Sequence, residues 1–249
     1  MVKIVPTPDW FLGKDVLIET FSFIILLVFS VLAIRNYKLT KNRKFLYLGS
    51  GFALIGVAQL ASILTKLVLY YDIGPSQSIG NAIVTSQLFS SVDIFYYAGF
   101  FFQRFLTLTG LYIIYRLPRE KKSLGDYLLV TYFILLSAFI SKEFYYFYHI
   151  TALFLLIMIT DNYYRIYLKN KFINTKVLLF AFGLLALSQM VFILSQFGLA
   201  FVIGNVIELT SYAILLILIV LILKHGKETR PYGNNFGYVG DDSGKKRKH

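Results

Sequence analysis

The sequence predicts an all-α membrane protein, a polytopic bundle of seven transmembrane helices. Three observations predict it: the composition, the length of the uncharged stretches and the placement of basic residues between them. Of the 249 residues, 57% are hydrophobic and only 15% are charged, whereas soluble domains have about 25% charged residues. Stretches without Lys, Arg, Asp or Glu, such as 45–65 and 177–206, exceed the roughly 18–20 residues that cross a bilayer.

Charged clusters between the apolar stretches delimit the seven expected helices. The helices are predicted at residues 12–35, 45–71, 88–116, 124–141, 143–168, 176–199 and 201–224. The fourth is the shortest, and it is joined to the fifth by Ser141, Lys142 and Glu143. The sixth and seventh meet just as closely at Gly198. Because such short connections join antiparallel neighbours, the sequence predicts an up-and-down bundle.

Basic residues occur in every second loop. The first, third and fifth loops carry five, four and four Lys or Arg residues, whereas the second loop, 72–90, and the sixth have none. Loops rich in Lys and Arg lie in the cytoplasm. We therefore expect a multi-pass protein of the cell membrane with its N-terminus outside and its C-terminus in the cytoplasm. The net charge of +12 then reflects orientation in the lipid bilayer, and nucleic acid is not an expected partner.

The chain is expected to have two parts. Residues 1–225 form the seven-helix membrane domain. Residues 226–249 contain Gly, Asn and Asp and end in Lys-Lys-Arg-Lys-His, with too few apolar residues to fold alone. We predict that they form a disordered basic tail in the cytoplasm, near anionic lipid.

An internal duplication is indicated when the chain is shifted over itself by 130 positions. Identical residues then coincide, among them Arg35 with Arg165, Lys41 with Lys171, Phe52 with Phe182, and Gln59 with Gln189. The pattern predicts a 3+1+3 arrangement, with repeat one at about 12–116, a linker helix at 124–141 and repeat two at about 143–224. Repeats of equal orientation imply a pseudo-twofold axis along the membrane normal. The alternative is a chance match of two apolar patterns.

Strongly polar residues within the apolar segments are the candidates for a functional site. Such groups are costly in a bilayer unless they face the bundle interior, a partner or a wet cavity. The rise of 1.5 Å per residue places them in the outer half of the membrane, and helical spacing places several on shared faces. The predicted ligand or ion cavity is lined by Glu208, Lys66, Glu19, His149, Asp93, Gln196, Asn205, Gln59 and Gln189.

Several of these positions coincide in the proposed duplication. Glu19 falls on His149 and Lys66 on Gln196, and a shift of 115 brings Asp93 onto Glu208. The counter-ion of Lys66 is expected to be Glu208, Glu19 or Asp93. Two alternatives stay open: the polar groups only join helices by hydrogen bonds, or Lys66 and Asp93 extend to the outer headgroups.

Arg104 lies near the middle of the third predicted helix. A guanidinium at that depth must find a partner or water, and we predict that it acts as a structural latch between helices. Glu208 and Asp161 are its candidate partners. Asp161 also lies four residues before Arg165, and the two are expected to form a pair at the membrane interface.

Enzymatic chemistry is not expected. The absence of cysteine excludes disulfides and thiol nucleophiles. No HExxH motif or phosphate-binding loop occurs, and with a single histidine in the predicted spans there is no bis-His haem pair. The sequence therefore predicts no catalytic residues, no metal site and no cofactor.

Seven helices with the N-terminus outside and a 3+1+3 duplication resemble the rhodopsin-like superfamily of heptahelical membrane sensors, over the whole membrane part. The resemblance is one of topology. Retinal is not expected, because residues 202–223 in the seventh helix contain no lysine for the Schiff base. SWEET-type transporters are a weaker resemblance, since the prolines that mark their helices are missing. All five prolines here lie outside the predicted spans, at Pro6, Pro8, Pro75, Pro118 and Pro231.

The function indicated first is that of a sensor or receptor-like module. A small ligand or ion would bind in the outer polar cavity, and helix displacement would signal to a separate cytoplasmic or membrane partner. One alternative is a transporter of small solutes or ions that uses the same cavity. The other is a membrane scaffold without catalytic activity.

Overall fold

The computed structural model describes residues 8–11, 13–41, 43–72, 82–116, 124–141, 144–194 and 198–228. Within these residues the regular structure is entirely helical, which confirms the predicted all-α class. It consists of a short 3-10 helix and seven α-helices: η1 (Asp9–Phe11), α1 (Lys14–Thr40), α2 (Arg43–Asp72), α3 (Ala82–Arg116), α4 (Leu124–Ile140), α5 (Tyr145–Asn170), α6 (Ile173–Ile193) and α7 (Gly198–Glu228).

Each α-helix corresponds to one predicted segment, but several ends differ from those predicted. The predicted sixth helix ran to residue 199, whereas α6 ends at Ile193. At this end the N–H of Leu194 donates a hydrogen bond to the carbonyl of Val191 (3.0 Å). The sequence placed the junction later, at Gly198. α1 and α5 run five and two residues beyond the predicted ends at 35 and 168.

α1 and α5 end in the same way. Lys41 (φ 55°) and Lys171 (φ 51°) both adopt the left-handed conformation that is uncommon for residues other than glycine. The N–H of Lys41 donates to the carbonyl of Tyr37 (2.8 Å), and the N–H of Lys171 donates to that of Tyr167 (2.7 Å). These C-terminal caps satisfy carbonyl groups that a helix end would otherwise leave unpaired.

Among the residues that the structure describes, four helices contain segments long and apolar enough to cross a membrane, at Lys14–Leu39, Arg43–Val68, Ile173–Ile193 and Gly198–Ile219. Large apolar side chains on the outside of the bundle, among them Phe21, Val31, Phe154 and Ile157, are more than half exposed. A surface of this kind is compatible with an integral membrane protein in a lipid bilayer. The other three spans stay a prediction.

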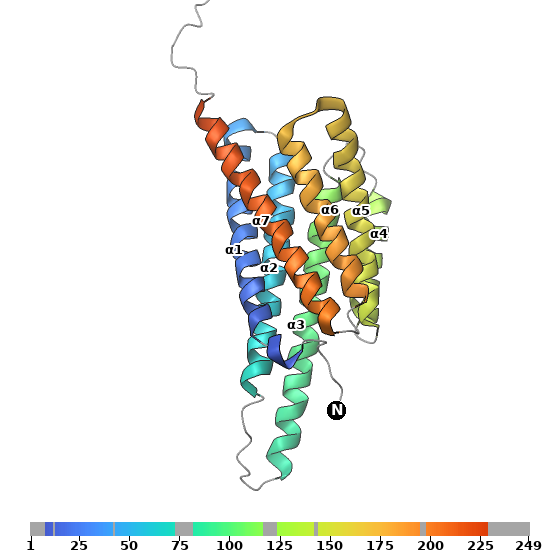
Figure 1. Ribbon diagram of the computed structural model, residues 1–249. Helices are drawn as coiled ribbons and strands as arrows, with labels where there is room; N and C mark the ends of the chain where they lie inside the picture. The colour runs from blue at the N-terminus through green and yellow to red at the C-terminus, as the bar shows by residue number, and fades with distance from the viewer. Residues whose placement is uncertain are drawn as a thin grey trace, which may run out of the picture.

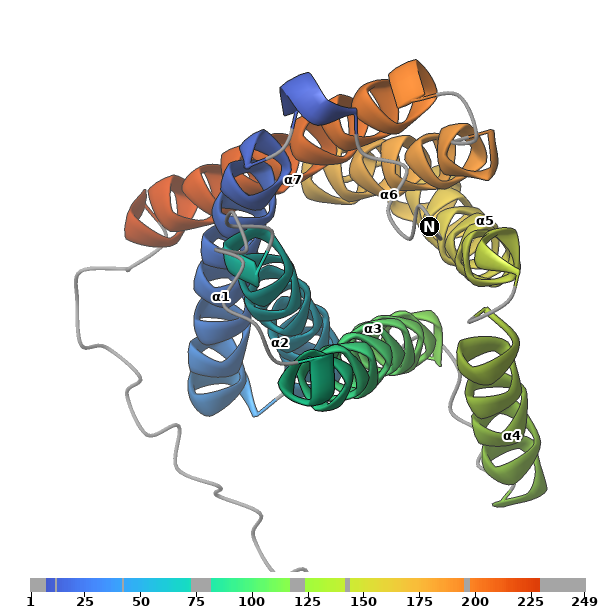
Figure 2. The ribbon, with the colours of Figure 1, turned by 90° about the horizontal axis from the view of Figure 1, so that it is seen from below.

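The helices form a ring with one member outside it. Consecutive helices run antiparallel, and α7 ends at the opposite end of the bundle from the start of α1 (Figure 1). Seen along the bundle (Figure 2), α1, α2 and α3 and then α5, α6 and α7 surround a common interior, with α4 outside against α3 and α5. Two contacts close the ring: α1 packs on α7, and α3 packs on α5.

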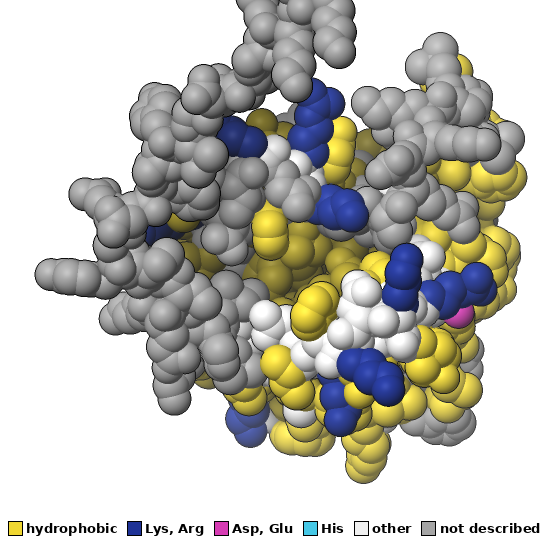
Figure 3. Space-filling model, turned by 90° about the horizontal axis from the view of Figure 1, so that it is seen from above, with side chains coloured by type: hydrophobic (Ala, Val, Ile, Leu, Met, Phe, Trp, Pro, Cys, Tyr) yellow, Lys and Arg dark blue, Asp and Glu magenta, His cyan; other side chains and the backbone are white. Residues whose placement is uncertain are grey.

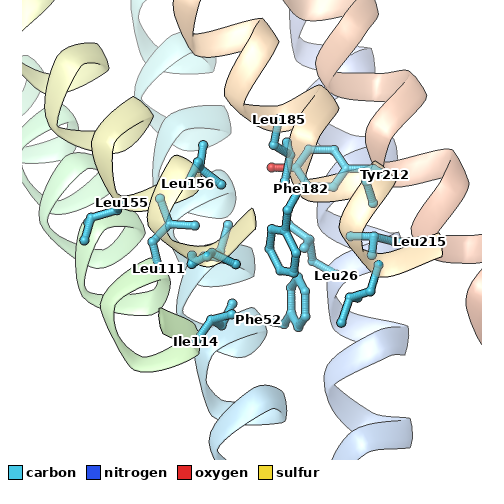
Figure 4. Close-up of a cluster of buried hydrophobic side chains, with 14 of the residues drawn as sticks. Leu26, Phe52, Leu111, Ile114, Leu155, Leu156, Phe182, Leu185, Tyr212 and Leu215 are labelled. Atoms are coloured by element: carbon cyan, nitrogen blue, oxygen red, sulfur yellow. The ribbon is translucent and has the colours of Figure 1, made fainter. Parts of the chain in front are cut away.

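A layer of aromatic side chains fills the interior of the ring. Phe52 of α2 and Phe182 of α6 point toward one another (Figure 4), with ring centroids 6.1 Å apart and planes at 18°. Phe29 packs on Phe52 at 4.5 Å, and Tyr163 packs on Phe182 at 5.5 Å. Phe52 and Phe182 are both fully buried. This aromatic layer lies about 14 Å from the start of α2, nine residues along the helix.

The end of the bundle at which α1 and α5 finish is basic. Seen from that end (Figure 3), Lys and Arg side chains stand around the rim of the face, with apolar side chains toward its centre. The basic residues described near this end are Arg35, Lys38, Lys41, Arg43, Lys44, Arg116, Arg165, Lys169, Lys171 and Lys176. The charge therefore distinguishes the two ends of the bundle, as the loop pattern predicted.

Candidate functional site

A cavity of about 110 Å³ lies inside the ring, on the side of the aromatic layer away from the basic end. All six helices of the ring line it, and no described residue of α4 does. On α2 its lining runs from Phe52 to Lys66, about 21 Å along the helix. Phe52 and Phe182 form the floor of this central cavity, which is large enough for several water molecules or one small organic molecule.

Lys66 holds two carboxylates at one wall of the central cavity. Its Nζ lies 2.8 Å from Asp15 Oδ2 and 2.7 Å from Glu19 Oε1, and both residues belong to α1. Ser62 Oγ also donates to Glu19 Oε1 (3.1 Å). Lys66 and Asp15 are almost completely buried. Two anions around one buried cation provide the pairing that a charge needs in an apolar interior.

Glu19 was one of the counter-ions predicted for Lys66, but Asp15 was not among them. Asp15 precedes Glu19 by four residues, so both face α2 from the same side of α1. Its Oδ1 also accepts the backbone N–H of Gly13 (3.1 Å) where the chain enters α1.

Glu208 of α7 is bound by neutral donors. Its Oε1 accepts hydrogen bonds from Gln59 Nε2 (3.3 Å) and from Tyr212 OH (3.0 Å). Asn205, one turn earlier, lines the cavity and donates to the carbonyl of Phe201 in its own helix (2.9 Å). A carboxylate thus reaches the cavity from α7, opposite the α3 and α5 side of the ring.

His149 of α5 forms the corresponding polar group on the other side of the ring. Its Nδ1 lies 2.7 Å from Oε1 of Gln189 on α6. The imidazole packs against the rings of Tyr145 (4.5 Å), Tyr148 (4.9 Å) and Phe192 (5.2 Å). The side chain is buried, with 5% of its surface exposed.

Two buried polar atoms beside the cavity lack a hydrogen-bond partner among the described residues. They are Glu19 Oε2 and His149 Nε2. An unsatisfied buried group of this kind costs about 1–3 kcal/mol, and most buried polar atoms in native proteins have a partner or an ordered water. Both residues line the central cavity, so a molecule bound there can satisfy both.

Arg104 joins α3 to the turn between α4 and α5. Its Nη1 donates to the carbonyl oxygen and to Oγ of Ser141, both at 2.8 Å. This contact agrees with a structural latch, although neither of the predicted carboxylates supplies it. Asp161 instead accepts from Nε of Arg165 (2.9 Å) in an exposed pair, which confirms that part of the prediction. A backbone carbonyl such as that of Ser141 has no signature in a sequence.

Seven of the nine residues predicted for the cavity line it: Glu19, Gln59, Lys66, His149, Gln189, Asn205 and Glu208. The side chains of Asp93 and Gln196 lie outside the described residues. Ser62 and Tyr212 also line the cavity, although they were not among the nine, and each lies four residues from a predicted residue, Lys66 or Glu208. In the part of the chain that the structure describes, no group of three or more His, Asp or Glu residues could hold a metal ion.

No protein family, curated protein or solved structure matches this chain. The resemblance to rhodopsin-like sensors and to SWEET-type transporters therefore stays a prediction from topology. The function has to be inferred from the cavity and its residues.

Proposed function

We propose that the chain is a seven-helix protein of the cell membrane that binds a small polar ligand or ion in the central cavity, as a sensor or receptor-like module. One observation carries the proposal: two buried polar atoms, Glu19 Oε2 and His149 Nε2, lack partners among the described residues beside this cavity. A packing role alone leaves them unsatisfied at a cost of about 1–3 kcal/mol each. A ligand that bonds to them recovers that free energy.

The floor of the cavity supports sensing. The aromatic layer of Phe29, Phe52, Phe182 and Tyr163 separates the cavity from the basic end. The positive-inside rule places the basic end in the cytoplasm and the cavity toward the outside. A ligand then arrives from outside, and helix displacement carries the signal across the aromatic layer to a separate partner.

Three features of the fold support the 3+1+3 duplication. Lys41 and Lys171, 130 positions apart, form the same left-handed cap. Phe52 and Phe182, also 130 apart, stack on one another, as equivalent residues do beside a twofold axis. The contact of α1 with α7 is matched by that of α5 with α3. The cavity then lies between two copies of a three-helix unit.

That location favours a second candidate, transport of a small solute. Transporters built from repeats bind their substrate near the midplane, where the repeats meet. Transport requires the aromatic layer to open, whereas sensing requires it only to shift. Uptake of a bound compound into proteoliposomes therefore separates the two functions.

A ligand screen on the purified full-length chain in lipid nanodiscs tests the proposal. We expect a small polar compound to raise the melting temperature, and Glu208→Gln to reduce that rise because the cavity loses a negative charge while Gln keeps the size of the side chain. Asp161→Asn, the same exchange at the exposed pair with Arg165, should leave the rise unchanged. If no compound in a broad screen shifts the melting temperature, binding is refuted and the scaffold interpretation takes its place.

A further inference from the structure

The two unsatisfied atoms beside the central cavity are both hydrogen-bond acceptors. Glu19 Oε1 already accepts from Lys66 and Ser62, and Oε2 is the oxygen left over. His149 Nδ1 faces the amide oxygen of Gln189, which can only accept. Nδ1 therefore carries the proton, and Nε2 presents a lone pair in the neutral ring. The cavity thus offers two acceptors and needs a donor.

Among the described residues, carboxylates reach the central cavity from two helices. Glu19 and Glu208 line it, together with the cations Lys66 and Arg104. A hydrogen bond from an ionised donor to a carboxylate is roughly twice as strong as one between neutral groups. The unsatisfied oxygen Glu19 Oε2 therefore favours a donor that carries a positive charge.

The walls of the cavity suit an organic cation. Aromatic side chains from five helices of the ring line it: Phe52, Phe100, Tyr145, Tyr148, Phe182, Phe192, Phe201 and Tyr212. The faces of such rings attract ammonium groups. The protein's own cations use this property, since Lys66 Nζ lies 5.9 Å from the Phe201 ring and the Arg104 guanidinium lies 5.8 Å from the Tyr145 ring.

We propose that the ligand of the central cavity is a small organic ammonium ion, whose N–H groups donate to Glu19 Oε2 and His149 Nε2. The inference rests on the proposed function, and it names the class of ligand. The two acceptors come from α1 and α5, which lie on opposite sides of the ring (Figure 2). An ammonium ion bound to both therefore joins the two three-helix units and responds to any change in their separation.

Four small probes on the purified full-length chain in nanodiscs test the inference at constant ionic strength. Methylammonium carries charge and N–H donors, tetramethylammonium carries charge alone, acetate is an anion and acetamide is neutral. We expect saturable binding of methylammonium by calorimetry, with tetramethylammonium weaker by about tenfold because it cannot donate hydrogen bonds. Acetate and acetamide should not bind.

Two variants test the named acceptors. Glu19→Gln removes the charge at nearly constant size, and His149→Phe removes the acceptor while keeping a ring against Tyr145 and Phe192. Each should raise the methylammonium Kd about tenfold or more, because a hydrogen bond to an ammonium is lost. His149→Phe leaves the Lys66 cluster intact, so it serves as the independent variant if Glu19→Gln folds poorly. Asp161→Asn should bind methylammonium as the unmodified chain does.

The possible outcomes separate this inference from the proposed function. Binding of acetate or acetamide in place of methylammonium, with a Kd that changes in Glu208→Gln, overturns the ammonium class and leaves a ligand-binding cavity. Methylammonium binding that both Glu19→Gln and His149→Phe leave unchanged also overturns the inference, since the ion then lies elsewhere. If neither the four probes nor any compound of the broad screen binds, both proposals are refuted.

Discussion

The α1–α2 pair and the α5–α6 pair use the same backbone arrangement with different polar chemistry. Both first helices end in a left-handed lysine cap, at Lys41 and Lys171. Near the cavity, however, α1 and α2 are joined by a charged cluster, in which Lys66 meets two carboxylates, whereas α5 and α6 are joined by neutral His149 and Gln189. One helix-pair geometry therefore accommodates either an ionic or a neutral contact. Removal of one partner should lower the free energy of unfolding more at the ionic contact than at the neutral one.

The contact of α2 with α3 and the contact of α6 with α7 differ as well. Between α2 and α3 two glycines meet, and a Cβ added to Gly110 would lie 2.7 Å from the carbonyl oxygen of Gly51. Between α6 and α7 a side chain makes the contact, as Ser211 Oγ donates to the carbonyl of Ala181 (2.7 Å). Ala181 stands 130 positions after Gly51. The α2–α3 contact therefore depends on close backbone approach and the α6–α7 contact on a hydrogen bond.

The largest expected effect comes from breaking the charged cluster. Lys66→Met leaves Asp15 and Glu19 as two buried carboxylates without their cation, and removal of one partner from a buried pair costs about 3–5 kcal/mol. The free energy of unfolding, measured by denaturant titration in mixed micelles, should fall by that amount.

A rescue variant sharpens this test. In the triple variant Lys66→Met, Asp15→Leu, Glu19→Met no charge remains in the cluster, and replacing a whole buried ion pair by well-packed apolar residues of similar volume is often close to neutral in free energy. Most of the lost stability should return. A triple variant as unstable as Lys66→Met would show that packing by the lysine stem, and not charge, holds α1 to α2.

A smaller effect is expected from the glycine contact. Gly110→Ala forces α2 and α3 apart, because the new Cβ meets the backbone of Gly51, and overpacking of this kind costs about 1–3 kcal/mol. Gly183→Ala in α6 is the matched control, since no atom lies within 4 Å of the added Cβ. Its helix propensity should instead raise the free energy of unfolding by up to about 1 kcal/mol. Equal changes in the free energy of unfolding at both positions would contradict the close backbone contact between α2 and α3.

The sequence was sufficient for the helices and for seven of the polar residues that line the cavity. Periods of three, four and seven residues placed Gln59, Gln189 and Glu208 on inward faces, because a polar group in an apolar helix has few other stable positions. Pairings were harder to predict. Arg104 binds Ser141 in a turn between two other helices, and such a contact depends on how α3 meets that turn. Sequence spacing within one helix carries no information about it.

The aromatic layer shows the same limit for apolar residues. Phe52 and Phe182 were identified as equivalent by the 130-residue shift, yet nothing in the sequence distinguished them from the chain's other 22 phenylalanines as the pair that stacks at the centre. Membrane helices bear apolar side chains toward lipid and toward the core alike, so hydrophobicity does not mark the buried face. Only the packing of α2 against α6 across the ring selects these two.

The smallest expected effect completes the comparison of the helix pairs. Gln189→Leu removes the neutral partner of His149 Nδ1 at nearly constant volume, and hydrogen bonds between membrane helices contribute about 0.6 kcal/mol on average and at most about 1.7. The free energy of unfolding should therefore fall by about 1 kcal/mol, well below the loss for Lys66→Met. Gln189→Glu supplies the contrast, since a carboxylate beside His149 converts the neutral contact into an ionic one. If Gln189→Leu costs as much as Lys66→Met under the same denaturant titration, the two units depend equally on their polar contacts, and the distinction between an ionic and a neutral unit is lost.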